Sequence, residues 1–137
     1  RARQGSIRAV QWVGGGNYGT PVPRDYSKKQ NRKERQLALK SALSYLAKEK
    51  RIVVVDKFDL ESGKTKDFKA MLNTLELADK KVLLVAEELT ENMILASRNL
   101  ENVILMETNE INVYDLLNAD VLLMNSEALK EVEEALK

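Results

Sequence analysis

The first forty residues of the chain gather the side chains that bind anions. Ten bases and two acids fall in residues 1–40, which gives this segment a net charge of +8. The bases are Arg1, Arg3, Arg8, Arg24, Lys28, Lys29, Arg32, Lys33, Arg35 and Lys40. Residues 41–137 hold the other 12 of the 22 bases and 19 of the 21 acids, a net charge of −7. A basic segment joined to an acidic remainder predicts a polyanion as the partner of the basic part.

The same segment lacks the spacing of regular secondary structure. Residues 1–29 show neither a 3.6-residue nor a 2-residue apolar period, and a glycine triplet and two prolines interrupt them. Such a composition is typical of an arm that is mobile until it binds a partner. Trp12, Tyr18 and Tyr26 add rings that stack on unpaired bases, beside arginines that bind phosphates. We therefore expect an extended arm that becomes ordered on RNA, with a plain flexible linker as the alternative.

A helix with one basic face is predicted to follow the arm. From Asn31 onward, apolar residues recur at intervals of three and four, on a face formed by Leu39, Ala42, Leu43 and Leu46. The residues that fall off this face are Arg32, Lys33, Gln36 and Lys40. The helix should pack through its second half and present cations through its first. Because this charge continues that of the arm, a phosphate-binding surface is favoured over an ordinary solvated face.

The remainder of the chain contains four short apolar runs. They are Ile52–Val55, Val82–Val85, Val103–Met106 and Val121–Met124. No polar residue interrupts any of them, which indicates strands buried on both faces. Strands of this kind belong to a parallel sheet that is covered by helices on each side.

Amphipathic segments between the runs predict the helices that cover this sheet. They are marked by Phe68, Met71, Leu72 and Leu75, by residues 90–97, by Val113, Leu116 and Leu117 after Asn112, and by Leu129, Val132 and Leu136 after Ser126. Strand and helix in alternation predict a three-layer α/β fold with right-handed crossovers. The chain is therefore expected to consist of an extended basic arm, residues 1–29, and an α/β globular domain, residues 30–137.

Enzyme chemistry finds little support in the residue types. The chain has no cysteine and no histidine, which removes disulfides, zinc sites built on those residues and histidine-based acid–base catalysis. Neither a Gly-x-Gly-x-x-Gly nor a P-loop motif is present. The apolar runs are far shorter than the roughly 18–20 residues that cross a bilayer. We expect no catalysis, no cofactor or metal, and no membrane association.

A small nucleotide- or Mg-dependent enzyme is the alternative hypothesis. Asp56, Glu87, Glu88 and Glu107 come just after three of the apolar runs. Carboxylates at the ends of parallel strands can bind Mg²⁺ for phosphoryl chemistry. Polar residues must also end any buried strand, so these four acids are weak support for a metal site.

Longer motifs of the chain occur together in one known family. The chain reads R-A-R-Q-G-S-I-R-A-V-Q-W-V-G-G-G from Arg1, P-R-D-Y-S-K-K from Pro23 and L-A-L-K-S-A-L-S from Leu37. It continues with K-T-K-D-F from Lys64, S-R-N-L from Ser97 and I-N-V-Y-D-L-L from Ile111. In these motifs, over essentially its whole length, the chain resembles the bacterial large-subunit ribosomal protein L-four family.

The resemblance implies a structural protein of the large ribosomal subunit that binds 23S rRNA and catalyses nothing. Members of the family thread a long loop into the rRNA, and its tip helps to form the narrow part of the nascent-peptide exit tunnel opposite ribosomal protein L-twenty-two. The resemblance further implies a role in subunit assembly, a cytoplasmic location and a monomer within the ribosome. Some members also repress their own operon by binding its mRNA. Residues Arg1 to about Tyr26 would be the returning half of the loop, and the natural N-terminus is expected upstream of Arg1.

The resemblance also implies which side chains contact the rRNA. Those that match the family motifs are Arg1, Arg3, Arg8, Gln11, Trp12, Arg24, Tyr26, Lys28 and Lys29. The basic helix adds Arg32, Lys33, Arg35 and Lys40, which match more loosely. The chain departs from the family at Val10, at Val13 and over Asn17–Thr20. The family commonly has a cation where Val13 stands, so Val13 is not predicted to contact rRNA.

Overall fold

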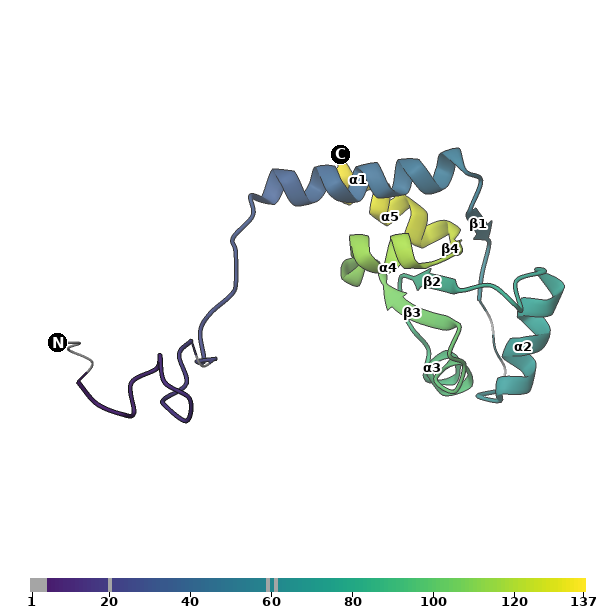
Figure 1. Ribbon diagram of the computed structural model, residues 1–137. Coiled ribbons are helices and arrows are strands. Elements are labelled where there is room, and N and C mark those ends of the chain that lie inside the picture. Colours follow the sequence, from purple (N-terminus) through teal and green to yellow (C-terminus); the bar gives the residue numbers. More distant parts are fainter. Residues whose placement is uncertain (1–4, 20, 59, 61) are drawn as a thin grey trace.

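The computed structural model describes residues 5–19, 21–58, 60 and 62–137 (Figure 1). In chain order its elements are α1 (Arg32–Lys48), β1 (Ile52–Val55), α2 (Thr65–Thr74), β2 (Val82–Ala86), α3 (Glu91–Ser97), β3 (Val103–Glu107), the 3-10 helix η1 (Thr108–Glu110), α4 (Val113–Asn118), β4 (Val121–Asn125) and α5 (Ser126–Leu136). The predicted alternation of strands and helices is confirmed. The sequence pattern did not predict η1, which connects the end of β3 to the segment before α4.

The four strands form one parallel sheet in the order β1-β4-β2-β3. Leu123 of β4 lies at the centre, with Val53 of β1 on one side and Leu84 of β2 on the other. All five residues of β2 are buried, as are the first four of β4. The two central strands are therefore covered on both faces, as their unbroken apolar sequences predicted.

The same prediction is wrong for β1 and β3. These strands form the two edges of the sheet, and Val54 and Ile104 expose 46% and 38% of their surfaces. An edge strand has a neighbour on one side only, so some of its side chains remain open to solvent. An apolar run of four residues does not reveal whether a strand lies at the centre of a sheet or at its edge.

Helices cover both faces of the sheet and complete the three predicted layers. Leu84 and Leu123 point to one face, where they pack with α2 and α3. Leu83 and Leu122 point to the other, where they pack with α1, α4 and α5. This alternation is the two-residue period of a β-strand. Figure 1 shows α1 and α5 on one side of the sheet and α2 and α3 on the other.

Polar side chains fix where several helices begin. Thr90, Asn112 and Asn125 each accept a hydrogen bond from the backbone N–H three residues further on. At the start of α1 the N–H of Asn31 donates to the carboxylate of Glu34 at 3.3 Å. This capping bond sets where α1, whose first turns carry the predicted cations, begins.

Candidate nucleic-acid interface

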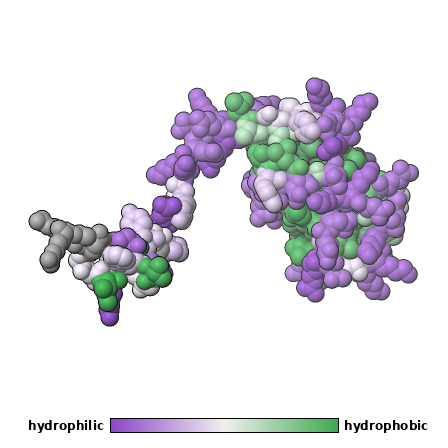
Figure 2. Space-filling model, in the orientation of Figure 1, coloured by the Kyte–Doolittle hydropathy of each residue, from purple (hydrophilic) through white to green (hydrophobic). Residues whose placement is uncertain are grey.

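The basic arm leads away from the domain. Within residues 5–19 and 21–31 there is no helix or strand. Figure 1 shows this part of the chain running from the start of α1 away from the sheet and its helices. Hydrophilic side chains continue from the arm onto the start of α1 (Figure 2). The exposed residues 24–33, most of them polar or charged, therefore link the arm to the start of α1 without a break in the described chain.

Part of the arm folds back on itself. Four backbone hydrogen bonds close residues 6–16, which we call the arm loop: Ala9 N–H to Ser6 O (3.1 Å), Trp12 N–H to Ala9 O (3.0 Å), Gly15 N–H to Trp12 O (3.0 Å) and Gly16 N–H to Arg8 O (3.0 Å). A Cβ at Gly15 would lie 2.1 Å from Ala9 O, so no larger residue fits this turn. The arm is thus compact over the arm loop, which holds Arg8, Gln11 and Trp12 close together along the backbone.

The three aromatic residues of the described arm are open to solvent. Trp12 exposes 48% of its surface, Tyr18 exposes 91% and Tyr26 exposes 72%. The guanidinium carbon of Arg24 lies 4.4 Å from the centre of the Tyr26 ring, which is the geometry of a cation–π contact. A ring and a guanidinium stacked at the surface offer one flat face to a base and charged N–H groups to a phosphate.

The single acid of the arm is held by its neighbour. The carboxylate of Asp25 accepts hydrogen bonds from the Ser27 N–H at 2.8 Å and from the Ser27 hydroxyl at 2.9 Å. The backbone bond, followed by the hydroxyl bond, lowers the pKa of Asp25 below its ordinary value. The Asp25 carboxylate is therefore hydrogen-bonded to Ser27. It forms no ion pair with Lys28 or Lys29 within the described structure.

The two ends of α1 differ in how their charges are balanced. At the C-terminal end, Arg51 forms an ion pair with Glu49 at 2.8 Å. A hydrogen bond to Glu49, strengthened by its charge, raises the pKa of Tyr45. At the N-terminal end, the exposed cations are Arg32, Lys33, Arg35 and Lys40, and none of them pairs with an acid of the described residues. In the described structure, the N-terminal end therefore offers a cluster of unpaired cations to a partner, whereas at the C-terminal end Arg51 is paired and the exposed Lys48 is not.

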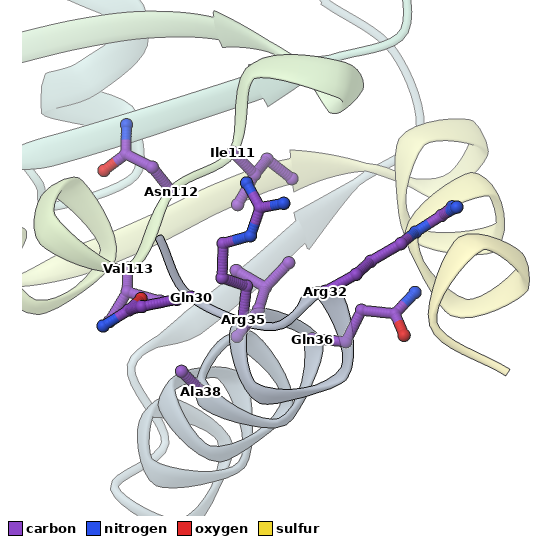
Figure 3. A pocket seen from close by; sticks show the side chains of 9 residues that line it. Gln30, Arg32, Arg35, Gln36, Ala38, Ile111, Asn112 and Val113 are labelled. Atoms are coloured by element: carbon purple, nitrogen blue, oxygen red, sulfur yellow. The ribbon is translucent and has the colours of Figure 1, made fainter. Parts of the chain in front are cut away.

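A pocket lies beside these cations (Figure 3). It opens between the first turns of α1 and the segment that precedes α4, and its volume is about 610 Å³. Arg32 and Arg35 line it from α1. On the other side it is lined by Ile111, which precedes α4, and by Val113, the first residue of α4. In Figure 3 the side chain of Arg35 extends from the helix toward Ile111. Sequence reasoning did not find this pocket, because nothing in the spacing of residues places the segment before α4 next to α1.

The acids at the ends of the strands do not form a metal site in the described structure. Asp56, Glu87, Glu88 and Glu107 are all exposed. Among the residues placed by the structure, no three carboxylates converge in a way that would hold a metal ion. The helices described are also too short or too polar to cross a bilayer. The geometry therefore gives the Mg-dependent alternative no support.

The predicted contact residues share one property. Those in the described structure are Arg8, Gln11, Trp12, Arg24, Tyr26, Lys28, Lys29, Arg32, Lys33, Arg35 and Lys40, and all of them are exposed. Arg1 and Arg3 were also predicted and lie outside the described residues. The structure thus brings the contacts of the arm loop together and aligns those of α1. Arg24, Tyr26 and the two lysines lie along the connecting segment.

A solvent-facing basic arm, exposed rings and a cationic helix end on an α/β domain are features of an RNA-binding protein. The chain matches the Ribosomal protein L4/L1 family over residues 1–135, and it belongs to that family. It is therefore a structural protein of the large ribosomal subunit that binds rRNA, in a class without enzymatic activity. The family resemblance stated from the sequence motifs is confirmed.

Proposed function

We propose that the basic arm and the N-terminal end of α1 together form the surface that binds 23S rRNA. The contact residues are Arg1, Arg3, Arg8, Gln11, Trp12, Arg24, Tyr26, Lys28, Lys29, Arg32, Lys33, Arg35 and Lys40. One observation carries the proposal: eight described cations lie close together in sequence over residues 8–40, all of them are exposed, and none pairs with a described acid. Such side chains neutralise phosphates and release counterions when RNA binds.

The shape of the arm supports a role inside folded rRNA. The described arm has no core of its own and stands away from the domain (Figure 1). A segment of this kind enters narrow spaces between RNA helices and becomes ordered there. We infer that the arm aids assembly of the large subunit and helps to line the nascent-peptide exit tunnel, near ribosomal protein L-twenty-two. The same surface would repress the protein's own operon by binding a folded segment of its mRNA.

The proposal is tested by the salt dependence of rRNA binding. In the full chain, the six arm cations Arg1, Arg3, Arg8, Arg24, Lys28 and Lys29 are replaced by glutamine. Each phosphate contact adds roughly 0.7–0.9 to the magnitude of the negative slope of log K against log salt. In this variant the magnitude of the slope should therefore decrease by up to about 5. Affinity is measured by filter binding to 23S rRNA over a range of salt concentrations.

The matched control removes the same charge from the domain. It replaces six exposed lysines with glutamine: Lys57, Lys64, Lys66, Lys69, Lys80 and Lys81. These lie outside the proposed surface, so the slope should stay within about one unit of the unmodified chain. Equal losses in the two variants would show that net charge alone drives binding, and the arm would lose its assigned role. Competition between 23S rRNA and the operon mRNA tests whether both bind this surface.

A further inference from the structure

The pocket beside α1 has the charge of an anion-binding site. Arg32 and Arg35 are three residues apart, which places them on the same side of the helix. The first turn of α1 adds the positive end of the helix dipole. Glu34 lies between them in sequence, but its carboxylate accepts the N–H of Asn31 at 3.3 Å. No carboxylate is present among the residues that line the pocket.

The opposite wall of the pocket is apolar and fixed in place. Ile111 and Val113 are half-buried and line it together with Leu39 of α1. Between Ile111 and Val113, the amide of Asn112 accepts the Asp115 N–H at 2.9 Å and donates to its carboxylate at 2.6 Å. These bonds hold the start of α4 in position. A phosphate alone would make no use of such a wall, whereas a flat ring would pack on it.

Two further amides at the pocket remain available for hydrogen bonding. Gln30 and Gln36 line it, and their side chains make no hydrogen bond within the part of the chain that the structure describes. An amide offers one acceptor and two donor hydrogens, which matches the edge of an unpaired base. The pocket therefore combines the three features that a nucleotide requires: cations, an apolar wall and amide groups.

We propose that this pocket holds one unpaired nucleotide of the bound rRNA. Its phosphate lies against Arg32 and Arg35, and its base packs on Ile111 and Val113. The inference rests on the proposed rRNA-binding function and extends it from a charged surface to a defined site for a single base. A volume of about 610 Å³ is within the range of small-ligand sites.

A nucleotide is favoured over a segment of a neighbouring protein. The pocket lies directly beside Lys33 and the other cations of the proposed rRNA surface, so a bound RNA strand passes close to it. A guanidinium such as that of Arg35 can bind a phosphate and can also stack on a base. A protein segment would need an acidic residue and an apolar residue in this one place, and it would leave binding to isolated rRNA unchanged.

Two uncharged substitutions in the full chain test the site. Val113→Ala removes two methyl groups from the wall, and Ala38→Trp fills the pocket from an exposed position of α1. Each should weaken binding to 23S rRNA by about tenfold, because the base loses its apolar contact or its space. Neither substitution changes a charge, so the salt slope should stay as it was. Ala70→Trp, at an exposed position of α2 outside the pocket, is the control and should leave affinity unchanged.

Chemical probing of the rRNA gives a second measurement. The unmodified chain should protect one unpaired base, and Ala38→Trp should remove that protection while the protections given by the arm persist. Unchanged affinity in both pocket variants would overturn the nucleotide site, and so would a loss of affinity with no single base exposed. Either result leaves the proposed rRNA surface standing if the arm variant still lowers the salt slope. If the arm variant leaves the salt dependence of rRNA binding unchanged, the proposed rRNA-binding surface itself is wrong.

Discussion

The arm and the α/β domain keep their shapes by different means. In the described part of the domain, two apolar clusters on opposite faces of the sheet hold the four strands and the five α-helices in place. In the described arm, order comes from four backbone hydrogen bonds, the Asp25–Ser27 contact and the Arg24–Tyr26 stack. All of these arm contacts are local in sequence. The described arm is therefore ordered without a buried apolar core, whereas the domain is ordered because its apolar side chains are buried.

This difference bears on where the proposed binding residues lie. A cation inside a folded domain must pair with an acid or remain at the surface, as Arg51 does with Glu49. The arm has no core that would require such pairing, so Arg8 and Lys28 keep their hydrogen-bonding capacity for a partner. The N-terminal end of α1 belongs to a helix that packs on the domain, yet the cations of this helix end are unpaired like those of the arm. The cations are thus concentrated in the arm and at this helix end, where residues 1–40 carry a net charge of +8, although lysines such as Lys57, unpaired in the described structure, also lie on the domain.

The largest expected effect is a loss of domain stability that the arm does not share. Phe68 is fully buried between α2 and the sheet, and Phe68→Ala should cost about 3–5 kcal/mol of unfolding free energy. Urea denaturation followed by circular dichroism measures this loss. Tyr18→Ala, at an arm residue that is 91% exposed, should change stability by less than about 0.5 kcal/mol. Comparable losses in both variants would mean that burial does not separate the two regions.

A smaller effect is expected from the arm loop, and it should fall on binding alone. Gly15→Ala places a Cβ where Ala9 O already lies 2.1 Å away, so the loop must open. Binding to 23S rRNA should weaken by about tenfold, because a preformed loop loses less entropy on binding than an open one. The urea midpoint of the domain should not change.

Gly16→Ala is the matched control for this prediction. A Cβ at Gly16 would meet Arg8 O at 3.7 Å, which is ordinary contact, so the loop should persist and affinity should stay within about twofold. If both alanine variants bind equally well, the arm loop is not preformed in the state that binds RNA.

The same contrast decides what sequence reasoning could find. The repeated apolar runs predicted the parallel sheet and its covering helices, because burial imposes a periodic pattern on the domain. The spacing of Leu39, Ala42 and Leu46 likewise predicted which side of α1 packs inward, and the structure confirms it. Strand order and edge positions were not predictable, since the apolar runs of β1 and β4 look alike.

The candidate site was predictable in its charge and not in its shape. Clustered bases such as Lys28 and Arg32 are visible in the sequence without any knowledge of the fold. The shape of the arm loop depends on backbone hydrogen bonds within residues 6–16, and these bonds leave no periodic pattern in the sequence. The pocket beside α1 depends on Ile111 lying next to a helix more than seventy residues earlier in the chain. Only the tertiary packing of α1 against α4 brings these elements together.

The smallest expected effect is an acid-induced loosening confined to the arm. Hydrogen bonds from Ser27 lower the pKa of Asp25, so the Asp25–Ser27 turn is stabilised above the ordinary pKa of 3.8. That stability is lost as the pH falls through the lowered value, because the protonated carboxyl is a poorer acceptor. The Ser27 amide resonance should therefore titrate with a midpoint below 3.8. In Ser27→Ala the backbone N–H still donates, and since that bond is the larger cause, the midpoint should move only part of the way back. A midpoint at or above 3.8 in the unmodified chain would show that the turn does not hold in solution, and the arm would then lack this element of local order.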